Sequence, residues 1–202
     1  MPSLLDLLFP PKCAFCRKRS ETSICDNCRR SLPWVTGQRE DCFAPFLYRD
    51  KVRTMLHRFK FQGYARYATV LGGLMLACLI DSGIPCPDAV CWVPSSKITL
   101  YKRGYSQSKQ LAAAVAGGFG APLRRLLYVS ARKKSQTKFR NASERADNVH
   151  GAFTARPAAR GLDILLVDDI YTTGATMNEC KSALLTAGAD YVTCVCAARA
   201  RQ

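Results

Sequence analysis

Hydrophobic positions follow two different periods along the chain, and segments of the two kinds alternate. Short apolar runs bounded by turn residues predict strands, and such runs occupy residues 42–50, 89–94, 124–133, 163–169 and 190–200. Apolar residues at helical spacing predict helices over residues 51–81, with a break at Gly63, and over residues 106–118 and 175–188. This alternation predicts an α/β fold with a doubly wound, mostly parallel sheet, helices on both faces, and ligands at the carboxyl ends of the strands.

Length and composition indicate how the chain is organised. It has 202 residues, of which 48% are hydrophobic, enough for one core of ordinary size and a small appendage. We expect residues 1–38 to form an amphipathic segment and a cysteine-rich knuckle, and residues 39–202 to form the main domain. The formal net charge of +15 favours anionic partners. Charge alone does not distinguish nucleic acid, an acidic membrane surface and a compact polyphosphate.

The apolar runs also bear on cellular location. The opening segment MPSLLDLLFPP has neither the basic region nor the small-residue cleavage site of a signal peptide. The longest apolar run, residues 68–80, is shorter than the ~18 to 20 residues that a membrane-spanning helix needs. We therefore expect no transmembrane segment and a cytoplasmic protein with reduced thiols.

Four of the eleven cysteines form two C-x2-C pairs, Cys13 with Cys16 and Cys25 with Cys28. Each pair forms a tight turn that aims two sulfur atoms at one point, and two pairs complete a tetrahedral thiolate site for zinc. Four unrelated thiols or two disulfides are the alternative, which a reducing compartment disfavours. Because so short a segment buries little apolar surface, we expect structural zinc to supply the folding free energy of the knuckle.

The stretch ILLVDDIYTTGAT, residues 164–176, combines a buried strand with polar chemistry. Asp168 and Asp169 are predicted at the carboxyl end of the strand, where a doubly wound sheet binds ligands. The turn that follows offers a phosphate backbone N–H groups, hydroxyls and the positive end of a helix dipole. The predicted phosphate-binding residues are Thr172, Thr173, Gly174, Ala175 and Thr176. The acids repel phosphate, so we expect them to accept hydrogen bonds from vicinal ribose hydroxyls, directly or through Mg²⁺.

An ordinary strand–turn–helix is the alternative interpretation of this stretch, since Asp and Thr are both good helix caps. A cap requires one such residue, whereas two acids, three threonines and a glycine occupy positions 168–176. The pattern therefore favours a ribose 5-phosphate site.

The segment VDDIYTTGAT resembles the phosphoribosyl-pyrophosphate (PRPP) signature of type I phosphoribosyltransferases: a hydrophobic strand, two acids and a T-T-G-x-T turn. Nearly the whole chain is similar to the ComF family of phosphoribosyltransferase-like proteins associated with bacterial competence. The similarity includes the knuckle, VPSSKITLYKRGYSQSKQLA, the basic segment ending in ERADNVHGAF, and ALLTAGADYVTCVCAARA after the signature. The family's R-G-F-N-Q stands here as R-G-Y-S-Q, with substitutions at Tyr105 and Ser106 that keep similar size or polarity.

This resemblance implies the type I phosphoribosyltransferase fold and a reaction. Pyrophosphate would be displaced from the anomeric carbon of PRPP, with Mg²⁺, by an acceptor that the sequence does not identify. Positive charge on the ribose and negative charge on the leaving group would be stabilised by carboxylates and cations. The implied catalytic residues are Asp168, Asp169 and Arg145.

The resemblance also implies further residues of a PRPP site. Hydroxyls, backbone amides and a cation after an earlier strand suit pyrophosphate, and Arg103 and Gln107 follow closely. The turn concerned consists of Pro94, Ser95, Ser96 and Lys97. The basic segment 131–148 corresponds to a loop that closes over the active site and excludes water. Within it Arg145 and Asn148 match the family's R-x-x-N pattern, while a solvated surface explains the other basic residues at least as well.

A nucleic-acid-binding protein that keeps the PRPP site as a sensor or relic is a rival hypothesis. The knuckle, the net charge and the stretch HRFKFQGYARY fit contact with single-stranded DNA, with Phe59, Phe61 or Tyr64 stacked on bases. Core packing explains these aromatic residues equally well. The family's association with natural transformation suggests DNA and other competence proteins as partners. A regulator that binds PRPP without turnover is a third hypothesis, and the oligomeric state is not predicted.

Overall fold

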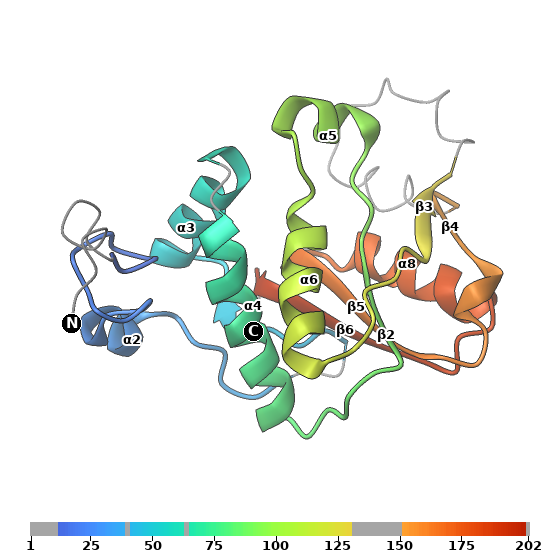
Figure 1. Ribbon diagram of the computed structural model, residues 1–202, viewed down its shortest axis with the longest axis horizontal. Helices are drawn as coiled ribbons and strands as arrows, with labels where there is room; N and C mark the ends of the chain where they lie inside the picture. Colours follow the sequence, from blue (N-terminus) through green and yellow to red (C-terminus); the bar gives the residue numbers. More distant parts are fainter. Residues whose placement is uncertain (1–11, 39–40, 63–64, 131–150, 201–202) are drawn as a thin grey trace.

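A four-stranded parallel sheet lies at the centre of the protein, in the strand order β1-β6-β5-β2 (Figure 1). The computed structural model describes residues 12–38, 41–62, 65–130 and 151–200. The strands of the sheet are β1 (Phe46–Leu47), β2 (Ala89–Trp92), β5 (Asp163–Tyr171) and β6 (Tyr191–Arg199). β5 pairs with both β2 and β6. Its unbroken run of Ile, Leu and Val is the sequence that a strand buried on both faces requires.

Helices cover both faces of this sheet, as the sequence predicts. The helices concerned are α3 (Asp50–Gln62), α4 (Ala65–Asp81), α6 (Gln107–Phe119) and α8 (Ala175–Thr186). α4 and α6 pack on one face with α3 beside them, and α8 packs on the other (Figure 1). Alternate residues of β5 serve the two cores: Leu165 and Val167 on the α6 side, Ile164 and Leu166 on the α8 side.

A short antiparallel hairpin on the α8 side stands outside the central sheet. It pairs β3 (Leu127–Val129) with β4 (Phe153–Ala155), and η2 (Pro157–Ala159) follows. Leu127 is buried with the α8 core, whereas Val129 is exposed. The sequence predicts β3 but not β4, because three residues are too few to show a clear period of two.

Serine and glycine residues mark the ends of the two helices that follow β2 in the chain. α5 (Lys97–Arg103) begins where the Ser96 hydroxyl accepts a hydrogen bond from the N–H of Thr99 at 3.1 Å, and it ends at Gly104 with φ 77°. At the start of α6 the Ser106 hydroxyl accepts from the N–H of Lys109 at 3.3 Å. Asn and Ser cap helices equally well, which explains why Ser106 can replace the Asn of the R-G-F-N-Q pattern. α5 is not among the helices that the sequence predicts.

The knuckle, which includes α2 (Asp26–Ser31), packs against α3. The ring of Phe15 meets that of Phe46 edge-on, with 5.6 Å between centroids. Nη1 of Arg58 on α3 donates to the carbonyl of Phe15 at 3.1 Å, and Nζ of Lys51 donates to the hydroxyl of Ser31 at 2.9 Å. Apolar residues of the knuckle and of α3 therefore form one continuous core.

The apolar run of residues 68–80 is a core helix, as predicted. It lies within α4, whose Leu71, Met75 and Leu79 are fully buried. Within the described ranges, no helix has both the length and the apolar character needed to span a membrane.

Candidate functional site

The carboxyl ends of β2 and β5 lie where the strand order reverses, and we call this region the crevice. β2 ends at Trp92, opposite Val167, so the two acids on β5 extend past its end. On its outer edge β2 makes a parallel bridge from Val90 to Leu123, in the segment after α6. The segment after α6 therefore lies on one edge of β2, and β5, which comes later in the chain, lies on the other edge. In open α/β sheets such a switch point is where ligands bind.

Asp168 and Asp169 lie side by side in this crevice, held by different partners. The Ser108 hydroxyl on α6 donates to Oδ1 of Asp168 at 2.7 Å, and the backbone N–H of Asp169 donates to the same oxygen at 2.8 Å. Oδ2 of Asp169 lies 3.1 Å from Nζ of Lys60 on α3, and these side chains are only 16% and 25% exposed. Neither of these contacts caps α8.

The electrostatics of the acid pair suit a cation. Burial and the negative charge of Asp169 raise the pKa of Asp168 to about 8, although hydrogen bonds from Ser108 and from the N–H of Asp169 favour its ionised form. A divalent ion beside both carboxylates would relieve their repulsion. Carboxylate oxygens are the ligands that Mg²⁺ prefers, so the residues present fit this metal.

The turn between β5 and α8 is shorter than the sequence suggests. β5 continues to Tyr171, so the turn consists of Thr172, Thr173 and Gly174. Both threonines are exposed. Gly174 has no side chain with which to cap α8, and the first N–H groups of a helix have no carbonyl partner within it; one of them, that of Ala175, makes a 3.4 Å contact with the Thr173 hydroxyl. The simple capping interpretation therefore accounts for neither the acids nor most of the turn.

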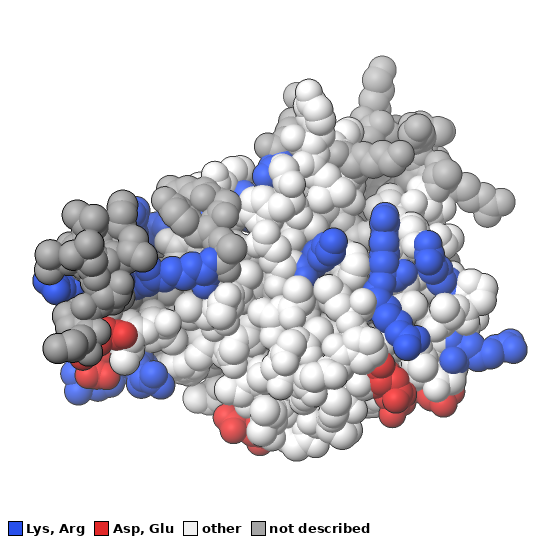
Figure 2. All heavy atoms as spheres, viewed as in Figure 1, with Lys and Arg blue, Asp and Glu red and all other residues white. Residues whose placement is uncertain are grey.

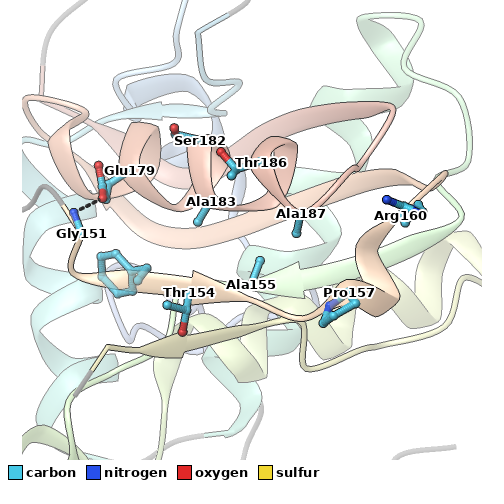
Figure 3. A pocket seen from close by; sticks show the side chains of 11 residues that line it. Gly151, Thr154, Ala155, Pro157, Arg160, Glu179, Ser182, Ala183, Thr186 and Ala187 are labelled. Atoms are coloured by element: carbon cyan, nitrogen blue, oxygen red, sulfur yellow. Dashed lines mark hydrogen bonds between the residues drawn. The ribbon is translucent and has the colours of Figure 1, made fainter. Parts of the chain in front are cut away.

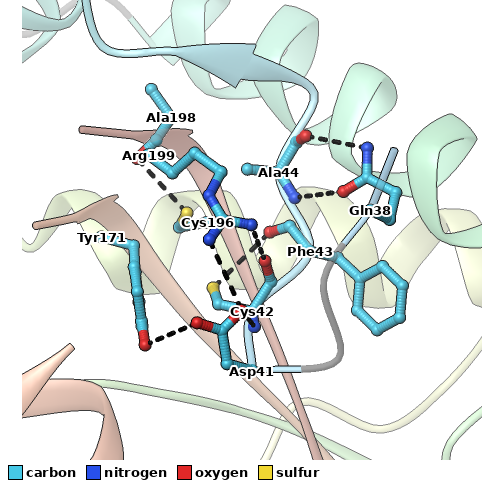
Figure 4. Close-up of polar contacts among 9 residues, drawn as sticks. All are labelled: Gln38, Asp41, Cys42, Phe43, Ala44, Tyr171, Cys196, Ala198 and Arg199. Carbon is cyan, nitrogen blue, oxygen red and sulfur yellow. Dashed lines mark hydrogen bonds and ion pairs between the residues drawn. The ribbon is translucent and has the colours of Figure 1, made fainter. Parts of the chain in front are cut away.

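Gly174 is required by a close contact as well as by its φ of +81°. A Cβ here would lie 2.3 Å from the hydroxyl oxygen of Tyr171. That hydroxyl donates to Oδ2 of Asp41 at 3.2 Å, while Oδ1 of Asp41 lies 3.5 Å from Nη2 of the buried Arg199 (Figure 4). Burial and the Asp41 carboxylate raise the pKa of Tyr171 to about 12, so its hydroxyl keeps its proton at neutral pH. These contacts fix the turn against β6 and the segment after the knuckle.

The turn predicted to bind pyrophosphate follows β2 directly, at the same edge of the sheet as the acids. Oγ of Ser95 lies 3.4 Å from Oγ of Ser106 at the start of α6. Ser96 caps α5, and Lys97 is the first residue of that helix. Pro94 and Ser95 are partly buried. The fold therefore brings this turn to the crevice that holds the acid pair.

Arg103 and Gln107 lie on the α3 side of the crevice with partners of their own. Nη1 of Arg103 donates to Oε1 of Gln107 at 3.1 Å, and its guanidinium lies 5.7 Å from the ring centroid of Phe61. Nε2 of Gln107 donates to the carbonyl of Lys60 at 3.4 Å. These contacts join α5 and α6 to the end of α3 and so help to position Lys60 beside Asp169.

Lys60 and Ser108 are crevice residues that sequence analysis did not single out. Lys60 belongs to the stretch considered for contact with single-stranded DNA, and Ser108 belongs to the segment VPSSKITLYKRGYSQSKQLA without a role predicted for it. Each reaches an acid only because its helix packs over the end of the sheet, so no local pattern would have found them. Two predicted residues, Arg145 and Asn148, lie outside the described part of the chain.

The four cysteines of the knuckle converge on one point. The Sγ atoms of Cys13, Cys16, Cys25 and Cys28 all lie within 4.8 Å of one another, and those of Cys16 and Cys25 are 3.7 Å apart. A tetrahedron with Zn–S bonds of about 2.3 Å has edges of about 3.8 Å. The N–H of Cys25 lies 3.5 Å from the sulfur of Cys13, and Nζ of Lys51 lies 3.9 Å from that of Cys28. Such contacts stabilise thiolate charge, so the donor set fits structural zinc.

A separate hollow of about 830 Å³ lies between α8 and β4 (Figure 3). Phe153 and Ala155 form one wall, and Glu179 and Ala183 form the other. At one end the Glu179 carboxylate accepts a hydrogen bond from the N–H of Gly151. None of the residues predicted for the sugar-phosphate site lines this hollow, so it is distinct from the crevice.

Comparison with protein families matches two parts of the chain. Residues 4–50 match the model of the double zinc ribbon domain, and residues 100–202 match the model of the phosphoribosyl transferase domain. The first match contains the four-cysteine site. The second covers more than half of the chain and contains the acid pair and the turn that follows it.

Curated relatives are similar over most of the chain. The DNA utilization protein YhgH of Salmonella typhi is 28% identical over 156 residues, which cover 75% of this chain and 69% of the relative. Competence protein ComFC of Bacillus subtilis is 29% identical over 182 residues, which cover 87% of this chain and 72% of the relative. Among solved structures, the allosteric regulatory enzyme of purine biosynthesis aligns with a TM-score of 0.42 and 23% identity, over 63% of this chain and 25% of that one.

Proposed function

Because the chain belongs to the phosphoribosyl transferase domain family, we propose that it binds PRPP with Mg²⁺ in the crevice between β2 and β5. One observation carries this proposal. Two partly buried carboxylates lie beside a hydroxyl-bearing turn that opens α8, both at the carboxyl end of one strand. The carboxylates suit the vicinal hydroxyls of a ribose, and the turn suits a phosphate.

Each part of PRPP is assigned to its own group of residues. The 5-phosphate binds the turn and the first N–H groups of α8, and the ribose hydroxyls bind Asp168 and Asp169. Pyrophosphate binds the turn after β2. The phosphate-binding residues proposed are Thr172, Thr173, Gly174, Ala175 and Thr176; those for pyrophosphate are Pro94, Ser95, Ser96, Lys97, Arg103 and Gln107.

When bound, Mg²⁺ supplies positive charge that stabilises the leaving pyrophosphate. Asp168 and Asp169 are the residues that would hold it, directly or through water. Lys60 pairs with Asp169 at 3.1 Å, so it holds that carboxylate in place and limits the net negative charge of the crevice.

We extend the proposal to transfer of the phosphoribosyl group. The bond between the anomeric carbon and the pyrophosphate oxygen breaks with its electron pair leaving on pyrophosphate, and an acceptor nucleophile forms the new bond. Carboxylates near the ribose stabilise the positive charge that develops on the ring. Arg145 and Asn148, which lie outside the described residues, are also proposed to act on this step. The relatives' names, for competence and DNA utilization, support a role in DNA uptake, and we propose that the protein acts in the cytoplasm.

Calorimetric titration of the purified protein with PRPP, with and without Mg²⁺, tests binding. We expect a single site that requires Mg²⁺ and is weakened at least tenfold in Asp169→Asn, because the loss of one charge-assisted hydrogen bond amounts to about 1.4 kcal/mol or more. Asp163→Asn is the matched control, since Asp163 lies at the opposite end of β5 and is exposed. Absence of PRPP binding in the presence of Mg²⁺ would refute the proposal. Release of pyrophosphate with candidate acceptors then separates an enzyme from a sensor.

Binding of single-stranded DNA is the second candidate function, and the exposure of one aromatic ring favours it. Phe61 is 64% exposed beside the guanidinium of Arg103, as a base-stacking platform requires. Phe59 is fully buried and cannot stack on a base, so core packing is the correct interpretation of that residue. Tyr64 lies outside the described residues. Basic side chains also lie over α6 and the β3–β4 hairpin (Figure 2).

Titration of a fluorescent single-stranded oligonucleotide at two salt concentrations tests this second function. We expect affinity to fall steeply with salt and to fall severalfold in Phe61→Ser. Ile80→Ser is the control, because Ile80 is similarly exposed near the far end of α4. Equal affinities for the two variants would exclude Phe61 as a stacking platform.

A further inference from the structure

Another concave site lies on the outer side of β2, apart from the hollow between α8 and β4, and we call it the outer pocket. It has a volume of about 610 Å³, within the range of small-molecule sites. Its walls come from the end of β2, the segment joining α5 to α6, the first turns of α6 and the segment before β3. The lining residues are Trp92, Pro94, Ser95, Leu100, Gly104, Tyr105, Ser106, Lys109, Gln110, Ala113 and Arg125.

The outer pocket is distinct from the PRPP crevice. Neither the acid pair nor the turn before α8 lines it, and only Pro94 and Ser95 belong to both sites. The helix α6 separates them, because Ser108 faces Asp168 while Gln110 and Ala113 face the outer pocket. The two sites therefore share part of one turn, while the acid pair belongs to the crevice alone and Lys109, Gln110 and Arg125 belong to the outer pocket alone.

The charge of the outer pocket favours an anion. Lys109 and Arg125 line it, and no acid is among its lining residues. Each cation is held by an aromatic ring: Nζ of Lys109 lies 5.6 Å from the centroid of Trp92, and Cζ of Arg125 lies 4.5 Å from that of Tyr128. Such contacts orient the cations without neutralising them. Lys109 and Arg125 therefore give the outer pocket two positive charges, and no carboxylate in its lining neutralises them.

An unpaired acceptor points to a second property of the ligand. Oε1 of Gln110 is buried and has no hydrogen-bond partner among the described residues. A buried amide oxygen without a partner destabilises the folded protein, so a ligand that supplies a donor gains binding free energy from it. A ligand with an N–H donor would satisfy this oxygen.

Apolar surface supplies the third property. Trp92, Tyr105 and Leu100 contribute ring and aliphatic surface to the walls, and Ala113 leaves room beside them. Tyr105 is held in place because its hydroxyl donates to the carbonyl of Phe59. Fixed aromatic walls of this kind suit a flat ring.

We propose that the outer pocket binds a nucleoside monophosphate. Its base would supply the flat ring and an exocyclic amine for Oε1 of Gln110, and its phosphate would pair with Arg125 and Lys109. Binding at this site is separate from PRPP binding, so each can fail without the other.

Fluorescence of Trp92 reports on the outer pocket. The chain has two tryptophans, and Trp34→Phe leaves Trp92 as the only one. Trp34 packs on Phe46 near the knuckle and does not line the outer pocket. We expect AMP to change the Trp92 emission saturably, and to bind at least tenfold more tightly than adenosine or inorganic phosphate, which each lack one of the two recognised parts.

Two variants test the assigned contacts in this background. Arg125→Gln removes the phosphate partner, and Gln110→Leu removes the amide acceptor. Each should weaken AMP binding about tenfold, the equivalent of about 1.4 kcal/mol. Gln110→Leu should also raise the melting temperature, because it removes a buried unpaired oxygen, so its weaker binding would not reflect misfolding. Asp169→Asn is the control and should bind AMP normally.

Three outcomes would overturn the proposal. One is the absence of any saturable signal with millimolar AMP. Another is unchanged AMP affinity in both Arg125→Gln and Gln110→Leu. The third is loss of AMP binding in Asp169→Asn, since that would place AMP in the crevice.

Discussion

The knuckle and the turn before α8 are both short loops that must hold several functional atoms in place, but different forces hold them. In the knuckle, four thiols lie within 4.8 Å of one another, and only a metal ion offsets the repulsion of four thiolates. In the turn, Gly174 is held by the ring of Tyr171, which is fixed in turn by Asp41 and Arg199. These contacts lie entirely within the protein.

This difference indicates how each loop can be disrupted. The knuckle depends on one ion and should lose its order as a unit, whereas the turn depends on packing and should respond to single side chains. The two loops are also connected. The knuckle shares a core with α3, and α3 carries Lys60, the partner of Asp169. Loss of the metal should therefore also disturb the crevice, whereas a change in the crevice should have little effect on the knuckle.

Removal of zinc should have the largest effect. Cys16→Ser, or a strong chelator, should lower the free energy of unfolding by several kcal/mol, because a structural zinc site contributes on the order of 10 kcal/mol to folding. Scanning calorimetry with metal analysis of the same sample would measure this. Cys86→Ser is the control, since Cys86 is an exposed thiol outside the knuckle. Equal melting curves with and without metal would contradict a folding role for zinc.

Gly174→Ala should have the next largest effect, concentrated on the turn. The left-handed φ costs a side chain roughly 1–3 kcal/mol, and the contact with Tyr171 adds to it. We expect PRPP affinity to fall more than tenfold in calorimetric titration. Gly73→Ala provides the control, because Gly73 lies in α4 with open space around its Cα, and Ala favours a helix by roughly 0.5–1 kcal/mol. Similar PRPP affinities in the two variants would show that the turn is not part of the site.

Asp168→Asn should have a smaller effect that depends on pH. The pKa of Asp168 is raised to about 8 in the folded protein from about 4 in an unfolded chain. The folded state therefore holds this proton more tightly, and the stability gained is present in full below pH 4 and lost as the pH rises to 8. Asn keeps the acceptor for Ser108 without the charge.

The variant should thus be more stable than the natural protein above pH 8, and equally stable near pH 3. Chemical denaturation at a series of pH values, without Mg²⁺, would measure the difference. A constant difference at all pH values would show that Asp168 does not titrate in this range.

Local patterns were enough to predict most elements of the fold. Buried strands such as β5 and amphipathic helices such as α3 show their period in a single window of sequence. The paired spacing of the cysteines and the VDDIYTTGAT segment carry their chemistry in the same local way. α5 and β4 were missed because they are short. The choice between base stacking and core packing stayed open for Phe59, because a basic stretch gives no sign of which aromatic residue faces inward.

The sequence by itself determined the alternation of strands and helices, the four cysteines of the zinc knuckle, and the turn that we propose binds the sugar phosphate. Only the tertiary structure decided how these parts are supported. Ser108 meets Asp168 across 60 positions of sequence, and Tyr171 meets Asp41 across 130. The outer pocket, too, exists only where α6 and the segment before β3 meet the edge of β2. Contacts of this kind depend on which helices pack over which strands, and periodicity within one segment carries no information about its partners.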